Sequence, residues 1–85
     1  MLAPVGKRMT WEQQREWLMD EIEKDAQSYR GPKSAGSMSV YFGRLDALFR
    51  VGLYFDFWDN DTMMRMSNWL KAPKGRSLRQ VLGEE

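Results

Sequence analysis

The chain has 85 residues, contains neither cysteine nor histidine, and carries a formal net charge of +1 at pH 7. The missing cysteine excludes disulfides and thiolate chemistry, and the missing histidine removes the commonest general base and metal ligand. The length fits one domain near the lower limit for folding without covalent staples, so we expect the chain to self-associate as a homo-oligomer.

The first predicted helix begins at Thr10 and ends before Gly31-Pro32. Thr10 and Gln13 have the spacing of a capping box, in which each side chain bonds to the backbone amide of the other residue. Residues 1–9 precede this cap and are expected to form a flexible N-terminal arm. Apolar side chains then recur on one helical stripe, which predicts a buried face: Trp11, Leu18, Ile22, Ala26 and Tyr29.

The second predicted helix follows a loop at residues 31–37, which are rich in turn formers. Ser37 or Ser39 is expected to cap it, and it should run to about Val51. Its apolar residues cover a wide face, which is typical of a helix buried on more than one side. They are Met38, Tyr41, Phe42, Leu45, Leu48 and Phe49.

Three small residues of this segment affect where the predicted helix ends and how closely another helix can pack on it. Gly52 suits the left-handed position that often follows the last turn of a helix. Gly43 and Ala47 lie one turn apart, where small side chains would let another helix approach closely. The alternative is that both are small residues tolerated on an ordinary helix surface.

The third predicted helix runs from an Asp56 cap to Ala72-Pro73, with Trp58, Thr62, Met66, Trp69 and Leu70 on its inner stripe. A cap at Asn60 or Asp61 is the alternative, and it would leave residues 53–59 as an ordered aromatic loop. The alternation of side chains at residues 53–57 also fits a strand, which is disfavoured because a lone strand has no pairing partner.

The expected fold is all-α: a small three-helix domain over residues 10–71, with helices two and three as an antiparallel hairpin. Residues 72–85 should form a basic linker and a short C-terminal helix, capped by Ser77 and Gln80. No apolar run approaches the roughly 20 residues that cross a bilayer, and the first residues lack the apolar centre of a signal peptide. We therefore expect a cytoplasmic protein that does not enter the membrane.

The sequence offers little for catalysis or metal binding. Asp59-Asn60-Asp61 resembles the start of a calcium loop, but Met64 would stand where the turn glycine belongs and Leu70 where the bidentate glutamate belongs. No glycine-rich phosphate loop and no conventional base for a serine nucleophile is present. We expect no metal, no cofactor and no enzymatic activity.

The surplus of aromatic residues favours protein binding as the function. The second and third helices cannot bury all of their rings at once, and exposed aromatic patches usually mark interaction sites. The rings expected outside the core, and therefore at a protein-binding site, are Trp17, Tyr54, Phe55 and Phe57. An inhibitor or regulator encoded by a phage or mobile element fits this profile, although its protein partner is not identified.

Two alternative functions use the basic residues. The C-terminal segment could bind nucleic acid through phosphate contacts, whereas a helix-turn-helix at Gly52 is disfavoured because Asp56, Asp59 and Asp61 would face the phosphates. An oligomer could instead bind a small anionic ligand such as a nucleotide, with Arg44 and Arg50 on the second helix. The candidate anion-binding residues are Arg44, Arg50, Lys71, Lys74, Arg76 and Arg79.

Overall fold

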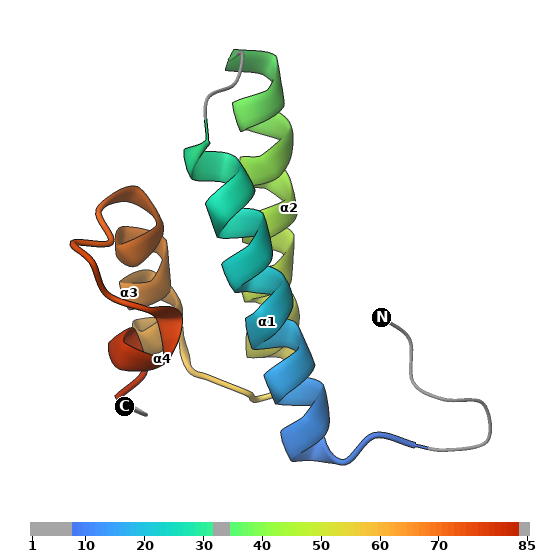
Figure 1. Cartoon of the computed structure of the whole chain (residues 1–85). Helices are drawn as coiled ribbons and strands as arrows, with labels where there is room; N and C mark the ends of the chain where they lie inside the picture. The colour runs from blue at the N-terminus through green and yellow to red at the C-terminus, as the bar shows by residue number, and fades with distance from the viewer. Residues whose placement is uncertain (1–7, 32–34, 84–85) are drawn as a thin grey trace.

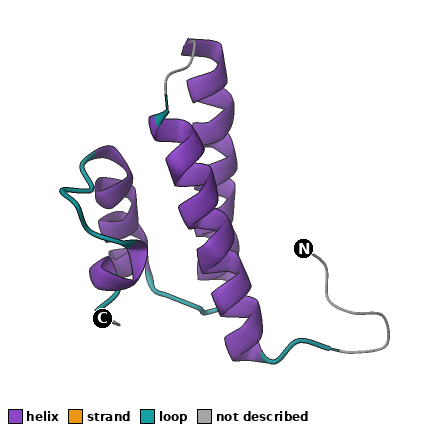
Figure 2. Cartoon of the chain, in the orientation of Figure 1, coloured by secondary structure: helices purple, strands orange, loops and turns teal. Residues whose placement is uncertain are grey.

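The computed structural model describes residues 8–31 and 35–83, and all regular structure in these two ranges is helical (Figures 1 and 2). The helices are α1 (Trp11–Arg30), α2 (Ala35–Tyr54), α3 (Asn60–Lys71) and α4 (Leu78–Val81). The all-α prediction is therefore confirmed. The predicted N-terminal arm lies mostly outside the described residues. None of the helices described is both long enough and apolar enough to cross a membrane.

The predicted limits of α1 are confirmed by its hydrogen bonds. The amide of Gln13 donates to Thr10 Oγ1 at 3.1 Å, and the amide of Thr10 donates to Gln13 Oε1 at 2.9 Å, which completes the capping box. At the other end, the amide of Gly31 donates to the carbonyl of Gln27 at 3.1 Å.

The predicted limits of α2 are wrong at both ends. Ser37 and Ser39 lie inside the helix rather than at its cap, and α2 continues beyond Val51 to Tyr54. Gly52 is a helical residue, and the left-handed conformation is taken four residues later by Asp56, with φ of 61°. The helix continues because the rings that follow it pack back onto its last turns.

The three longer helices form a bundle in which neighbours run in opposite directions (Figure 1). α1 and α2 lie side by side as a long antiparallel hairpin, and α3 runs antiparallel to α2. The pairing of helices two and three agrees with the sequence prediction, and the hairpin of α1 with α2 adds the most extensive packing in the fold.

The core contains side chains from all four helices and from the α2–α3 connection. Trp58 lies in this connection rather than on α3, and its indole N–H donates to the carbonyl of Phe49 at 3.0 Å. This bond satisfies the polar atom of a buried ring. The buried apolar residues are Leu18, Met19, Ile22, Ala26, Leu45, Phe49, Phe57, Trp58, Met66, Trp69, Leu70, Leu78 and Val81.

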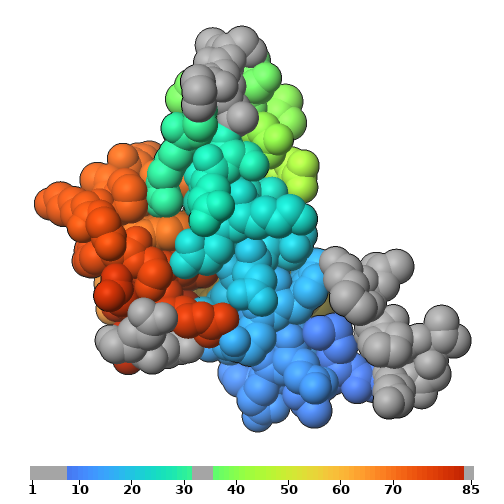
Figure 3. Space-filling view, viewed as in Figure 1, coloured from blue at the N-terminus to red at the C-terminus, as the bar shows by residue number. Residues whose placement is uncertain are grey.

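The C-terminal segment folds back over α3 and reaches the middle of α1 (Figure 3). The indole N–H of Trp69 donates to the carbonyl of Arg76 at 2.8 Å, and the amide of Leu78 donates to Glu23 Oε1 on α1 at 2.7 Å. Ser77 and Gln80 form the predicted capping box of α4.

Candidate protein-binding surface

The turn after α2 is built by two backbone hydrogen bonds. The amide of Phe57 donates to the carbonyl of Gly52 at 2.8 Å, and the amide of Asp56 donates to the carbonyl of Leu53 at 3.2 Å. This 6→1 and 5→2 pair, with Asp56 left-handed, is a Schellman motif. The sharp turn leaves Tyr54 on the last turn of the helix and brings Phe57 back against the core.

A series of four rings in contact runs across this turn and onto the start of α1. The centroids of Tyr54 and Phe55 are 5.4 Å apart, those of Phe55 and Phe57 are 6.0 Å apart, and those of Phe57 and Trp11 are 5.3 Å apart. These separations lie in the range of favourable aromatic pairs. The series joins residues that are more than 40 positions apart in the sequence.

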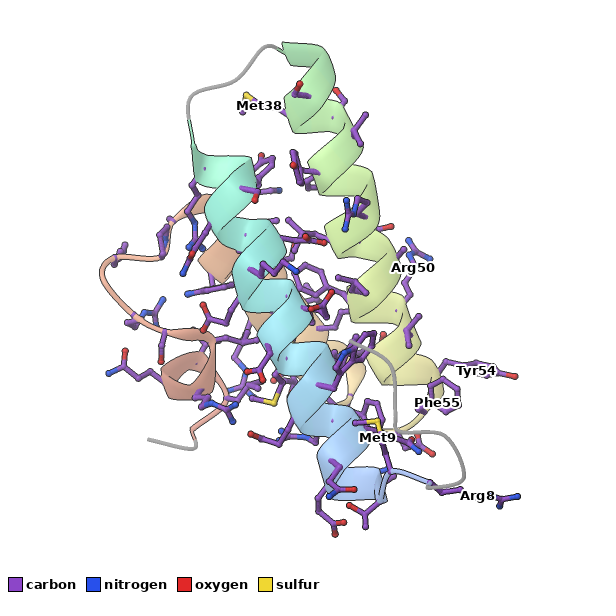
Figure 4. All side chains as sticks on the ribbon, turned by 45° about the vertical axis from the view of Figure 1, so that its right-hand side comes forward. Arg8, Met9, Met38, Arg50, Tyr54 and Phe55 are labelled. Carbon is purple, nitrogen blue, oxygen red and sulfur yellow. The ribbon has the colours of Figure 1, made fainter. Side chains whose placement is uncertain are left out.

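Three of these four rings are exposed. Tyr54 is 83 % exposed, Phe55 is 54 % exposed and Trp11 is 49 % exposed. Tyr54 and Phe55 point away from the helices at the end of α2 (Figure 4). We call Trp11, Tyr54 and Phe55 the aromatic surface. The structure thus agrees with the prediction that Tyr54 and Phe55 stay outside the core.

Phe57 corrects one prediction of exposure. It is 7 % exposed and belongs to the core, because the Schellman turn directs it inward. Its carbonyl accepts a hydrogen bond from Arg15 Nε on α1 at 3.3 Å, which ties the turn to the first helix. Phe57 therefore supports the aromatic surface from below and does not form part of it.

The sequence predictions for Trp11 and Trp17 agree only in part with the structure. Trp11 was assigned to the buried stripe of the first helix, yet it is half-exposed because it lies on the first turn, where the core ends. Trp17 is 37 % exposed, in agreement with its predicted exposure, but it stands about 120° around α1 from Trp11. It lies outside the ring series. The signal in the sequence that could have identified Trp11 was its position on the first turn of the helix, directly after the Thr10 cap.

The candidate anion-binding arginines on α2 are engaged within the chain. Arg44 Nε lies 3.4 Å from a carboxylate oxygen of Asp25, which is buried on α1. Arg50 Nε lies 2.9 Å from a carboxylate oxygen of Asp46, one helical turn away. These pairs reduce the positive charge available for a ligand.

Arg79 is engaged as well. Its guanidinium lies 2.7 Å from Glu16 and 3.4 Å from Asp20, so it connects α4 to α1. The hydrogen bond from Arg79 holds the pKa of the Glu16 carboxyl below its ordinary value. Lys71, Lys74 and Arg76 are exposed around the C-terminal loop, and the structure does not gather them with the arginines of α2.

The acids near the start of α3 act as a helix cap. Asp59 Oδ1 accepts a hydrogen bond from the amide of Thr62 at 2.8 Å, and hydrogen bonding by the side chain and the amide of Thr62 lowers the pKa of the Asp59 carboxyl. The start of α3 therefore follows the alternative with an ordered aromatic loop, with Asp59 as its cap in place of Asn60, Asp61 or the preferred Asp56. Within residues 8–31 and 35–83, no cluster of three or more potential metal-ligating side chains is found.

No family model, curated protein or solved structure matches this chain. Its function therefore has to be inferred from its own residues.

Proposed function

We propose that the chain is a non-enzymatic binding protein that holds a partner protein against the aromatic surface, as an inhibitor or regulator would. The ring series carries this proposal, because three neighbouring rings remain exposed while the buried Phe57 fixes the turn that presents them. Exposed aromatic side chains supply large contact area at a low cost in conformational entropy, and they are enriched among the residues that dominate binding energy.

The form of the surface indicates the chemistry of the partner. Tyr54 protrudes from the end of α2, with most of its ring exposed, and Phe55 stands beside it (Figure 4). A protruding pair of rings is complementary to a concave apolar pocket with a hydrogen-bond acceptor at its mouth for the tyrosine hydroxyl. We therefore expect the partner to contribute the pocket and this chain to contribute the inserted side chains.

Nucleic-acid binding gains less support from the geometry. The arginines on α2 and α4 that were considered for anion binding are paired with Asp46, Asp25, Glu16 and Asp20. A phosphate would have to displace these carboxylates, which costs the existing ion pairs. The aromatic surface lies at the end of α2 and the start of α1, whereas Lys71, Lys74 and Arg76 lie at the end of α3 and in the loop after it.

Affinity capture with matched variants tests the proposal. Tagged wild-type chain would be used to capture a partner from a lysate of its natural host, and the binding constant of the purified partner would then be measured. Phe55→Ala and Trp11→Ala should each weaken binding by about thirtyfold or more, as truncation of a dominant interface aromatic does. Met64→Ala is the control, because Met64 is an apolar residue on α3 that is at least as exposed as Phe55 and Trp11.

The same measurement can contradict the proposal. If Phe55→Ala and Met64→Ala bind the partner equally well, the aromatic surface is not the binding site. If Lys74→Ala with Arg76→Ala abolishes activity while Phe55→Ala retains it, the nucleic-acid function takes precedence. Circular dichroism of each variant separates loss of binding from loss of the helical fold.

A further inference from the structure

The outward side of α2 is apolar along most of its length, whereas the outward side of α1 is mostly polar. Val40, Gly43, Ala47, Val51 and Tyr54 are exposed and follow one another at intervals of three or four residues, opposite the side that contributes Leu45 and Phe49 to the core. We call these five residues the outer stripe of α2. The corresponding exposed residues of α1 are Gln13, Trp17, Asp20, Lys24 and Gln27, so this stripe carries one apolar side chain, Trp17, among four polar ones.

The outward side of α1 is therefore suited to contact with water, whereas the outward side of α2 is suited to contact with another apolar surface. A solvated helix face normally carries charged and polar groups, as α1 does. On α2, Val40 is 61 % exposed, and an added Cβ at Gly43 would meet no heavy atom within 4 Å. The described part of the chain thus leaves a shallow, apolar strip of about 21 Å along α2 uncovered.

We propose that a second copy of this chain covers the outer stripe, with the two α2 helices antiparallel about a two-fold axis at Ala47. This axis places Gly43 opposite Val51 of the second copy and Val40 opposite Tyr54 of the second copy. Each small or medium side chain then faces a larger one, and the two alanines meet at the axis. Small residues at the centre permit the close approach that such packing needs.

The charges beside the stripe support a second copy as the occupant. Arg50 and Asp46 flank one edge of the stripe and lie 2.9 Å apart within one chain. In an antiparallel pair of helices related by a two-fold axis, the same edge of both copies lies on the same side of the pair. The edge with Asp46 and Arg50 therefore lies beside the identical edge of the second copy. With the axis at Ala47, Asp46 lies within about 3 Å along the helix axis of Arg50 of the second copy. Along the helix axis this edge would then read arginine, aspartate, aspartate, arginine, so each arginine lies next to an aspartate of the other copy and the two aspartates are neighbours at the centre.

The opposite edge of the stripe does not bring like charges of the two copies close together. Arg44 lies there, and its guanidinium is directed to Asp25 of its own chain at 3.4 Å. The two Arg44 residues of a dimer would be about 9 Å apart along the helix axis. Figure 4 shows Arg50 and Tyr54 pointing away from the neighbouring helices, toward the side from which a second copy would approach.

Disulfide cross-linking tests the register directly, because the natural chain has no cysteine. Under mild oxidation, Ala47→Cys should form a covalent dimer in high yield, since the two positions meet at the axis. Val40→Cys alone should not, because the two copies of residue 40 would be about 21 Å apart along the axis. Gln27→Cys on the outward side of α1 is the control for random collision.

A disruptive variant gives an independent measurement. Native mass determination of the wild type should give twice the chain's 10.0 kDa. Ala47→Glu should weaken self-association at least about a hundredfold, because two unpaired carboxylates would meet at the axis. Gln27→Glu should leave the dimer intact. A monomeric wild type at high protein concentration, an unchanged Ala47→Glu dimer, or equal cross-linking of Val40→Cys and Ala47→Cys would each overturn the proposal.

Discussion

The indole of Trp58 lies against the backbone of Gly52, in the space that a β-carbon at residue 52 would occupy. Trp58 is buried, and its N–H donates to the carbonyl of Phe49 one turn earlier on α2. The aromatic connection therefore packs onto the last two turns of α2 rather than following a helix end at Gly52. This contact fixes the position from which the aromatic surface is presented.

The first prediction concerns this contact. Gly52→Ala should lower the free energy of unfolding by about 1–3 kcal/mol, because the added methyl forces the Trp58 ring and its hydrogen bond to move. Gly43→Ala is the matched control, since it lies on the same helix with open space around it. Chemical denaturation of both variants, in the Ala47→Glu background to keep the chain monomeric, supplies the measurement.

The control variant Gly43→Ala should change stability in the opposite direction to Gly52→Ala. Gly43→Ala should raise the free energy of unfolding by about 0.5–1 kcal/mol, as alanine does in an exposed helix interior. If both substitutions stabilise the chain, Trp58 does not pack on Gly52 in solution.

The second prediction concerns the left-handed residue of the turn. Asp56 has φ of 61°, a conformation that glycine adopts without strain. Asp56→Gly should therefore stabilise the fold by roughly 0.5–1 kcal/mol and leave the ring series in place. Asp56→Ala removes the same carboxylate but keeps the β-carbon, so it should give no stabilisation. Thermal and urea unfolding of the two variants would separate backbone strain from charge, and a gain for alanine as large as for glycine would refute the assignment to strain.

The third prediction separates the two adjacent phenylalanines of the turn. Phe57→Ala should destabilise the fold by about 3–5 kcal/mol, because the ring belongs to the core. Phe55→Ala should change stability by no more than about 0.5 kcal/mol, as expected for an exposed side chain. Urea unfolding followed by circular dichroism measures both. Equal losses of stability would mean that Phe55 is also buried.

The fourth prediction concerns pH. The hydrogen bond from Arg79 lowers the pKa of Glu16 in the folded chain, so the folded state prefers the ionised carboxylate. The stabilisation from this pair is then present above the ordinary value of 4.5 and is lost as the pH falls through the lowered folded value. Glu16→Gln should therefore be less stable than the wild type near neutral pH, and the two unfolding midpoints should converge in acid.

A suitable comparison for this pH effect is Glu12→Gln, which makes the same charge change on the first turn of α1. Glu12→Gln keeps the pair of Arg79 with Glu16, so it should still show the acid loss of stability that this pair causes, whereas Glu16→Gln should not. If the difference between the unfolding midpoints of the wild type and Glu16→Gln stays constant across the acid range, Arg79 does not stabilise the ionised Glu16 carboxylate in solution.

The fifth prediction joins the two proposed surfaces. In the proposed dimer, Phe55 of each copy lies about 12 Å along the helix axis from the two-fold axis, on opposite sides, so the dimer presents two binding surfaces about 24 Å apart. We expect two partner molecules to bind one wild-type dimer and one to bind each Ala47→Glu monomer. Native mass determination of the complexes would give the number of partner molecules bound in each case. A monomeric variant that no longer binds any partner would indicate that the aromatic surface is completed by the second copy. Tyr54 belongs both to the aromatic surface and to the outer stripe of α2, so a Tyr54 variant would change both and is unsuited to this experiment.

Local chemistry in the sequence was sufficient for most helix ends. The capping boxes of Thr10 with Gln13 and of Ser77 with Gln80 need only residues that are three apart, and both form as predicted. The stop at Ala72-Pro73 is equally local, because proline cannot continue the helical hydrogen bonds. The all-α class followed from the same short-range signals, together with the spacing of Leu18, Ile22 and Ala26.

The exposure of the aromatic rings was decided by long-range packing. Residue spacing could not show that Gly52 would receive an indole from Trp58, nor that Asp56 would take the left-handed conformation expected at Gly52. The Schellman turn that results buries Phe57 and leaves Tyr54 and Phe55 outside, and only the fold brings Trp11 beside them. Sequence by itself determined which segments are helical and that aromatic surface would be in surplus. The tertiary structure decided which rings form that surface, because burial depends on contacts between residues far apart in the chain.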